Sequence, residues 1–449
     1  MDNAVHPVDE RLPFPRLLML GLQHVLALYA GAVTVPLVLA GAIGLSKDAT
    51  AVLISADLFA GGIVSIIQSL GIGIFGIRYP LMMGVTFVAI GPMIAIGLNP
   101  ELGLNGIFGS VMVAGVIGFL VAPLMSRLVR YFPPVVTGSV ILVIGVSLMG
   151  VGITYAGGGY GAKDFGAPLY IGIAFFVLLC IILISRYGNG LLSNISVLLG
   201  IAAGFVLAGV LGMVSFTGLS QAPWFAPVIP FHFGMPKFDL LAIVSMSLVM
   251  IVTLIESMGG IFAMGDIIDK TPTQNDIKRG LRADGLGALI GGIFNTFPYT
   301  TFSQNIGLVY VSGIRSRFVC VMAGAIMILL GLVPKLSVLV ASIPDFVLGG
   351  ATVVMFGMVA ANGVRILQDV DFRSNRHNVL IVAVSLGMGM IPMVSDKFFA
   401  KFPTDIGTLL NSGIALCAIS AVVLNYLANG RAGKDEVDAM MRENVKAPI

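Results

Sequence analysis

Charged residues are scarce in this chain of 449 residues. Aspartate, glutamate, lysine and arginine make up 10% of it, whereas an ordinary soluble domain has about 25%. Hydrophobic residues account for 57%, and so few charges cannot cover that much apolar surface in water. The composition therefore excludes a soluble globular protein. The net charge of +3 is small, so it gives no reason to expect a nucleic-acid partner.

Cysteines and the motifs of catalytic centres are also few or absent. The three cysteines, Cys180, Cys320 and Cys417, stand far apart in apolar runs and are interpreted as small core residues. The sequence contains no G-x-x-x-x-G-K-[ST], H-E-x-x-H or G-x-S-x-G motif, which mark ATPases, zinc proteases and serine hydrolases. We therefore expect no enzyme activity, no metal and no cofactor.

Long hydrophobic runs, in contrast, are abundant. Those at 17–40 and 106–125 are each long enough to cross a bilayer. The first run has full span length and no convincing small-residue cleavage site, so no signal peptide is expected. Breaks at proline, glycine and charge clusters predict an all-α polytopic membrane protein with fourteen spans. The spans lie near 17–42, 50–75, 80–97, 105–125, 134–156, 168–186, 191–213, 238–266, 280–296, 302–313, 317–335, 345–366, 377–394 and 404–428.

The distribution of basic residues supports this number of spans. With both termini in the cytoplasm, 19 lysines and arginines fall in cytoplasmic segments and 6 in outer loops, and every arginine is inside. This is the asymmetry that the positive-inside rule describes, and an odd error in the count would disturb it downstream. We expect a multi-pass protein of the inner cell membrane with cytoplasmic termini.

Two pairs of segments indicate an internal repeat. "FPPVVTG" (132–138) resembles "IPDFVLG" (343–349), and "RYPLMMGVTF" (78–87) parallels "TFPYTTFSQN" (296–305). Seven spans per half place the second copy upside down, which is the inverted-repeat plan of secondary transporters. The long outer loop at 214–237 is the expected seam between the halves.

Prolines interrupt the third and tenth spans at matching places. Pro80 and Pro298 remove backbone donors where a continuous helix needs them. Paired interruptions of this kind predict short extended segments and a binding site at the membrane midplane. Half-helices beginning near Thr86 and Ser303 would direct free N–H groups at that site. The alternative is two ordinary prolines at the membrane interface.

Ionisable and amide groups within the spans are candidates for such a site. Glu256 lies at the middle of an uncharged span, where a carboxylate costs about 2.5–3.5 kcal/mol to insert; the alternative is a structural hydrogen bond between helices. Gly259 and Gly260 lie on its helical face and are expected to leave room beside it. Gln304 and Asn305 need hydrogen-bond partners away from water.

Three other polar residues are harder to interpret. Asp284 is expected to open the ninth span, either as a helix N-terminal charge or as a functional group. A lone histidine such as His24 is more often a packing residue, and Asp57 is expected to be interfacial. A buried acid, buried amides and no ATPase motif suggest ion-coupled transport; the alternatives are a channel and a membrane-embedded enzyme.

"SQNIGLVYVSG" (303–313) resembles the Q-N-x-G-x-x-x-x-T-[GRK] signature of the nucleobase–ascorbate transporter family. The resemblance continues over nearly the whole chain, in "GLQHVLALYAGAVTVPL" (21–37), "GVTF" (84–87), "IES" (255–257) and "RADGLG" (282–287). The sequence is most similar to bacterial uric acid and xanthine permeases. The signature positions are Gln304, Asn305, Gly307, Ser312 where threonine is usual, and Gly313.

The resemblance implies a fold of seven plus seven inverted spans, in which a core domain moves against a gate domain, commonly in a homodimer. The implied divisions are an N-tail (1–16), core (17–130), gate (131–213), outer loop (214–237), core (238–340), gate (341–428) and C-tail (429–449).

The resemblance also implies function: import of a purine, uric acid and/or xanthine, with a proton. Glu256 and Gln304 would hold the base, Phe87 would stack on it, and the backbone at Thr86, Phe87 and Ser303 would add hydrogen bonds. His24, Asp284 and Asn305 would shape the site, and Ser312 would affect substrate preference. The alternatives are a permease for uracil or another nucleobase, or an anion transporter or channel with the same fold.

Overall fold

A computed structural model describes residues 6–125, 133–395, 397–399, 401, 402, 410 and 412–430, and this part of the chain is mostly helical. Its first half contains η1 (Pro7–Asp9), α1 (Phe14–Ala42), α2 (Lys47–Leu70), β1 (Met83–Val85), η2 (Phe87–Ala89), α3 (Ile90–Gly97), α4 (Gly103–Val121), η3 (Ala122–Leu124), α6 (Pro134–Ala156), α7 (Pro168–Tyr187), α8 (Leu191–Asn194) and α9 (Ser196–Val210). Its second half contains α10 (Leu240–Ile267), α11 (Gln274–Ile293), β2 (Tyr299–Thr301), α12 (Ser303–Ser312), α13 (Arg317–Gly331), α14 (Pro334–Ala341), α15 (Asp345–Leu367), α16 (Arg376–Val394) and α18 (Gly413–Asn429).

The membrane-spanning character of these helices confirms the predicted class. Eight described helices are long and apolar enough to cross a bilayer, or nine if α13 and α14, which meet at an angle of 80°, form one bent span. The count of fourteen spans stays a prediction. In the predicted last span, 404–409 and 411 lie outside the described residues, as do 1–5 and 431–449 of the predicted tails and 126–132 near the predicted first core–gate boundary.

The contacts between helices repeat from one half of the chain to the other. In one group, the contact of α2 with α13 corresponds to the contact of α11 with α4. The contact of α1 with α13 likewise corresponds to the contact of α10 with α4. In the other group, the contacts of α7 with α9 and α15 correspond to the contacts of α16 with α18 and α6. The equivalent helices α6 and α15 pack on each other. The corresponding pairs follow the same order in the two halves. This is the packing expected of an internal repeat.

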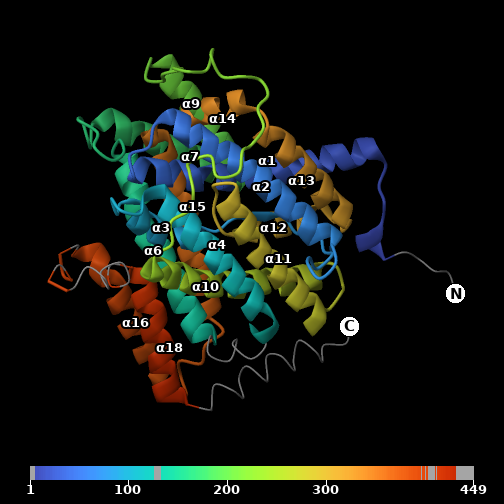
Figure 1. Cartoon of the computed structure of the whole chain (residues 1–449), viewed down its shortest axis with the longest axis vertical. Helices are drawn as coiled ribbons and strands as arrows, with labels where there is room; N and C mark the ends of the chain where they lie inside the picture. The colour runs from blue at the N-terminus through green and yellow to red at the C-terminus, as the bar shows by residue number, and fades with distance from the viewer. Residues whose placement is uncertain are drawn as a thin grey trace.

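Figure 1 shows where these two groups lie. α9 is at the top of the view and α16 and α18 are at the bottom, while α1, α2 and α13 cross between them. At the centre of the second group, α6 and α15 approach so closely that a Cβ at Gly145 would overlap Ala360 and one at Gly363 would overlap Leu142. Glycine at these positions permits the close helix contact.

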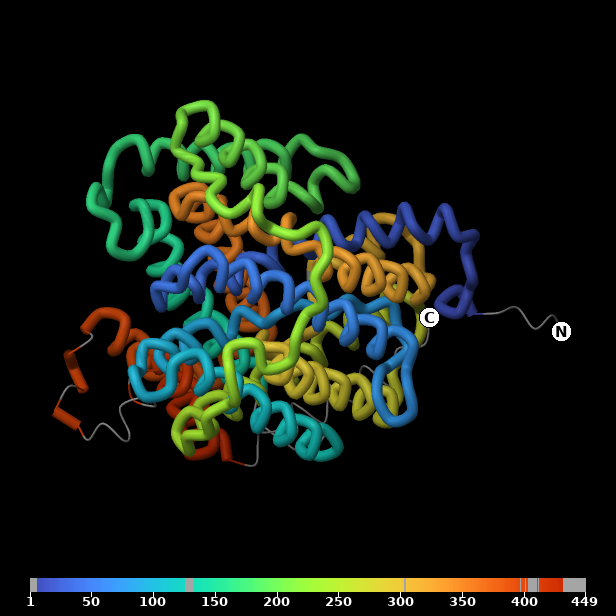
Figure 2. Tube along the Cα trace, turned by 45° about the horizontal axis from the view of Figure 1, so that its top comes forward, coloured from blue at the N-terminus to red at the C-terminus, as the bar shows by residue number. Residues whose placement is uncertain are grey.

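The connection between the halves, 211–239, crosses the molecule as an extended strap (Figure 2). Its backbone is tied to the helices beneath it: Ala226 N–H donates to the Leu332 carbonyl over 3.2 Å, and Phe231 N–H donates to the Ile293 carbonyl over 2.9 Å. Further along, Lys237 N–H donates to the Asn105 carbonyl over 2.9 Å. The predicted seam is therefore packed on the ends of α4, α11 and α13.

Candidate substrate-binding site

The two predicted interruptions meet as a two-stranded antiparallel sheet. β1 pairs with β2 in the register Met83 with Thr301, Gly84 with Thr300 and Val85 with Tyr299. The pairing extends at both ends, since Thr86 N–H donates to the Pro298 carbonyl (3.0 Å) and Phe302 N–H donates to the Met82 carbonyl (2.9 Å). Strands with exposed edges do not survive in lipid, so each interruption satisfies the backbone of the other.

A helix begins directly after each strand. η2 starts at Phe87 and continues into α3, and α12 starts at Ser303. The first N–H groups of a helix have no partner within it and carry the positive end of its dipole. The predicted half-helix starts are therefore present in both halves. The Thr86 hydroxyl is directed into this turn, where it accepts a hydrogen bond from Val88 N–H (3.2 Å).

Glu256 on α10 lies next to this sheet. Its neighbour Ser257 accepts a hydrogen bond from Thr301 N–H (3.1 Å), and the Ser257 and Thr300 hydroxyls are 3.0 Å apart. These contacts hold α10 against β2. Glu256 is partly buried, and its Oε2 atom is buried without a hydrogen-bond partner in the described part of the chain. The protein therefore places a carboxylate oxygen with unused acceptor capacity beside the sheet.

The two glycines after Glu256 differ from the prediction that both leave room. A Cβ added at Gly259 would meet nothing within 4 Å, so this position is open. A Cβ added at Gly260 would lie 2.8 Å from Thr301 Cγ2, so Gly260 instead lets β2 pack closely on α10. The prediction holds for Gly259 and is wrong for Gly260, because the sequence did not reveal that β2 covers that position.

Gln304 and Asn305 are adjacent in sequence but differ in environment. Gln304 is partly buried on α12, whereas Asn305 is fully buried. Asn305 Nδ2 lies 3.0 Å from His24 Nδ1 and donates to the His24 carbonyl (2.9 Å). The packing interpretation of His24 therefore agrees with a direct contact between α1 and α12. Asn305 therefore ties α12 to α1.

Asp284 does not open its helix, and that prediction is wrong. α11 begins at Gln274, with a capping box in which Thr273 and Asp276 exchange hydrogen bonds. The true N-terminus therefore lies ten residues earlier, in the polar stretch that precedes the predicted span. Asp284 is fully buried in the helix interior, and its oxygens make no hydrogen bond of good geometry with the described residues.

The remaining predicted residues occupy different places. Phe87 is partly buried, and its ring packs edge-on against Phe356 of α15 with the ring centres 5.9 Å apart. Ser303 is the first residue of α12. Ser312 lies at the other end of the same helix, about 13 Å away by helical rise, where its hydroxyl accepts a hydrogen bond from Ile314 N–H (3.3 Å).

One buried cluster was missed in the sequence. Asp57 on α2 is buried, so the prediction that it is interfacial is wrong. Its Oδ1 atom accepts hydrogen bonds from Thr296 Oγ1 (3.0 Å) and the Tyr299 hydroxyl (2.9 Å). Only a contact between α2 and β2 explains the buried acid, and the local pattern of α2 carries no signal of it beyond the acid itself.

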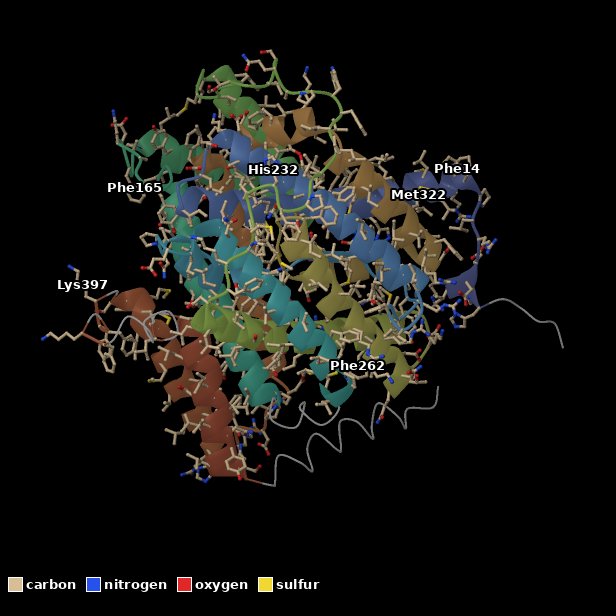
Figure 3. The ribbon with its side chains drawn as sticks, in the orientation of Figure 1. Phe14, Phe165, His232, Phe262, Met322 and Lys397 are labelled. Atoms are coloured by element: carbon tan, nitrogen blue, oxygen red, sulfur yellow. The ribbon has the colours of Figure 1, made fainter. Side chains whose placement is uncertain are left out.

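A cavity of about 740 Å³ is lined by none of the predicted substrate-binding residues. It is bounded by the strap and by α2 and α14, with Lys47, Ser55, Gln221 and His232 among its lining residues. His232 is labelled in Figure 3, on the strap that crosses the molecule. Size alone therefore does not locate the candidate site, which is identified by the converging strands, helix ends and acid.

Two inverted halves that each supply a broken segment to one central polar site define a class of membrane transporters. Comparison with known sequences agrees: the chain belongs to the Permease family, whose sequence model matches residues 15–398. The chain is 54% identical over 430 residues to the uric acid transporter UacT of Escherichia coli (strain K12), covering 96% of this chain and 89% of that protein. It is 42% identical over 436 residues to the xanthine permease of Bacillus subtilis (strain 168), covering 97% of this chain and 99% of that protein.

Solved structures share the fold at low sequence identity. The transmembrane domain of the cyanobacterial bicarbonate transporter BicA matches with a TM-score of 0.60 and 15% identity, over 93% of this chain and 99% of that one. The murine Solute Carrier 26 family member A9 anion transporter, in an inward-facing state, matches with a TM-score of 0.63 and 13% identity, over 93% of this chain and 69% of that one. These likenesses confirm the predicted fold class, a polytopic helical transporter fold. The family and these relatives are permeases and transporters, as predicted for a chain that is not an enzyme.

Proposed function

We propose that this protein is a secondary active transporter that imports a purine, uric acid and/or xanthine, together with a proton. The observation that carries the proposal is the buried Oε2 atom of Glu256, which has no hydrogen-bond partner among the described residues. A buried acceptor without a partner costs free energy unless a ligand supplies the donor. The names of the relatives, a uric acid transporter and a xanthine permease, support the choice of substrate.

The side chains that we assign to this site match the chemistry of a purine. Urate and xanthine present adjacent N–H donors and carbonyl acceptors on a flat ring. The Glu256 carboxylate accepts from the donors, the Gln304 amide matches a mixed donor and acceptor edge, and the Phe87 ring stacks on the face. In this proposal the backbone at Thr86, Phe87 and Ser303 adds hydrogen bonds to the base.

The proposal assigns coupling and motion as well. Glu256 and the buried Asp284 are the acids near which a symported proton is held. The helices of 17–130 and 238–340 form the core, and those of 131–213 and 341–428 form the gate that it moves against. His24 and Asn305 keep α12 in place during this motion. We further propose a homodimer in the inner membrane with both termini in the cytoplasm.

An anion substrate is the second candidate. The helix starts at Phe87 and Ser303 provide dipole ends that favour a negative group, and one structural relative is named as an anion transporter. Uracil or another nucleobase is a closer alternative, because it uses the same acceptor and donor groups.

Labelled uptake in transport-deficient cells tests the proposal. We expect accumulation of urate or xanthine that a protonophore abolishes, with the Glu256→Gln variant as the inactive control. Uptake of uracil alone would assign the protein to pyrimidines. Sodium-dependent uptake that resists the protonophore would contradict proton coupling. Uptake of bicarbonate or chloride without any uptake of purine would favour the anion candidate.

A further inference from the structure

Two partly buried arginines in the first half of α11 take part in none of the ion pairs that the described residues form. The ion pairs of the described residues join Arg315 to Asp269 and Arg317 to Asp9. Arg279 and Arg282 belong to neither pair, and the Nε atom of each is buried without a hydrogen-bond partner in the described part of the chain. A guanidinium has donors only, so each of these buried N–H groups needs an acceptor from elsewhere.

Asp276 and Asp269, two carboxylates near these arginines in the sequence, are already engaged, and Asp284 forms no ion pair with either arginine in the described part of the chain. Asp276, one turn before Arg279, closes the capping box with Thr273: its Oδ2 atom accepts from Thr273 N–H at 3.0 Å. Asp269 is paired with Arg315. The Nε–H groups of Arg279 and Arg282 therefore lack an acceptor, and both arginines lack an ion-pair partner, among the described residues. Their positive charge favours an anion as that partner.

An aromatic wall adjoins Arg282. Its guanidinium lies over the ring of Phe119, 5.2 Å from the ring centre, and the Phe119 ring packs on Phe75 with centres 5.6 Å apart. α4 and α11 touch here, since a Cβ at Gly285 would lie 2.5 Å from Phe119 N. This contact fixes the arginine at the end of α4 rather than leaving it on a flexible surface.

The surface that leads away from Arg282 along α4 is apolar and uncovered. Val116, Leu120 and Leu124 recur every four residues and are 43%, 61% and 48% exposed. Ile72 and Ile74, in the glycine-rich hairpin next to Phe75, are also exposed. In a chain that crosses a membrane, such a stripe lies against acyl chains, and it ends at two cations with unmet donors.

We propose that Arg279 and Arg282 bind the phosphate of an anionic phospholipid whose acyl chains lie along the α4 stripe. A small phosphate ion would satisfy the arginines but would leave the stripe unused. Basic sites between membrane helices that abut lipid are known binding places for anionic headgroups. The site is separate from the central strands, and its occupation does not depend on which substrate is transported.

The test uses the purified full chain in an uncharged detergent, with thermal unfolding as the readout. Phosphatidylglycerol should raise the midpoint temperature, whereas phosphatidylcholine and glycerol phosphate should not. The R279Q/R282Q variant should need roughly tenfold to a hundredfold more phosphatidylglycerol for the same rise, because it loses charge-assisted bonds. The matched control is R365Q/R373Q, which removes two exposed arginines near the end of α15 and should respond like the unaltered chain.

A second variant separates lipid binding from charge. Leu120→Asn alters the stripe without changing the charge, so it should also weaken the response to phosphatidylglycerol. Native mass spectrometry should show one tightly held anionic lipid in the unaltered chain and none in R279Q/R282Q. Equal loss of response in R279Q/R282Q and R365Q/R373Q, or an equal response to phosphatidylcholine or glycerol phosphate, would overturn the proposal.

Discussion

The molecule holds two carboxylates in its membrane helices whose surroundings are opposite. Asp57 on α2 is buried, and its Oδ1 atom accepts hydrogen bonds from Thr296 and Tyr299. Glu256 on α10 has a buried oxygen without a partner in the described part, and open space one turn on at Gly259. An acid whose acceptors are filled by the protein stabilises the protein; an acid with acceptors left over is available to a ligand.

The largest effect is expected at Glu256. Glu256→Gln keeps the volume but replaces one acceptor oxygen with an NH₂ group, which would face a donor of the proposed purine substrate. Each charge-assisted hydrogen bond is worth about 1.5–3 kcal/mol, so we expect near-complete loss of uptake at normal abundance in the membrane. Glu256→Asp, which keeps the charge, should retain part of the activity. If both variants vanish from the membrane, the acid is structural after all, as Asp57 is.

Gln304→Ala should come next. The loss of two neutral hydrogen bonds, at about 0.5–1.5 kcal/mol each, weakens purine affinity roughly fivefold to a hundredfold. Protein abundance should be unchanged, because water can occupy the vacated volume. Inhibition of labelled uptake by unlabelled urate and xanthine measures the affinity. Unaltered affinity would remove Gln304 from the site.

Asp57→Ala should show the opposite pattern, with a loss of stability rather than of affinity. The Thr296 and Tyr299 hydroxyls would lose the buried carboxylate, at a cost of about 1–3 kcal/mol for each unmet group. The midpoint of thermal unfolding should fall by several degrees, while the KM of the folded protein stays within about twofold of the original. Asp57→Asn, which keeps one carbonyl acceptor, is the milder comparison. A large rise in KM at unchanged stability would place Asp57 among the substrate-binding groups.

Alanine substitutions at Gly259 and Gly260 of α10 test how much space lies beside Glu256. Gly259→Ala adds a methyl group in open space, so abundance should be normal and KM should change by only a few-fold. Gly260→Ala would crowd Thr301, whose Cγ2 lies 2.8 Å from the added atom, and should lower abundance. Immunoblots of membranes and uptake kinetics distinguish the two. Equal abundance of the two variants would contradict the difference in packing between Gly259 and Gly260.

Ser312→Thr should have the smallest effect. Its hydroxyl lies at the end of α12 away from Gln304 and accepts from Ile314 N–H, and threonine keeps that hydroxyl. Transport should continue, with at most a shift in preference between urate and xanthine in competition assays. Loss of transport would mean that the end of α12 takes part in the transport cycle.

The sequence predicts the fold class, the repeat and the broken segments because each has a local signal. Hydrophobic runs mark spans, and Pro80 and Pro298 mark interruptions. The pairing of β1 with β2 has no such signal, since it joins residues more than 200 positions apart. The errors at Asp57 and Gly260 share this cause, because residues in β2 or just before it supply the neighbours of both. At Asp284 the polar first turns of α11 hid its start.

The strand pairing also has a consequence for how the protein is made. Met83 and Thr301 come from opposite halves of the chain, so β1 leaves the ribosome long before its partner exists. Until β2 is inserted, the backbone of 83–85 has unpaired hydrogen-bonding groups at membrane depth, which lipid cannot satisfy. The first half is thus an incomplete folding unit that must be held in a protected environment during synthesis. A chain truncated before residue 299 should be removed by membrane quality control instead of persisting as a stable half.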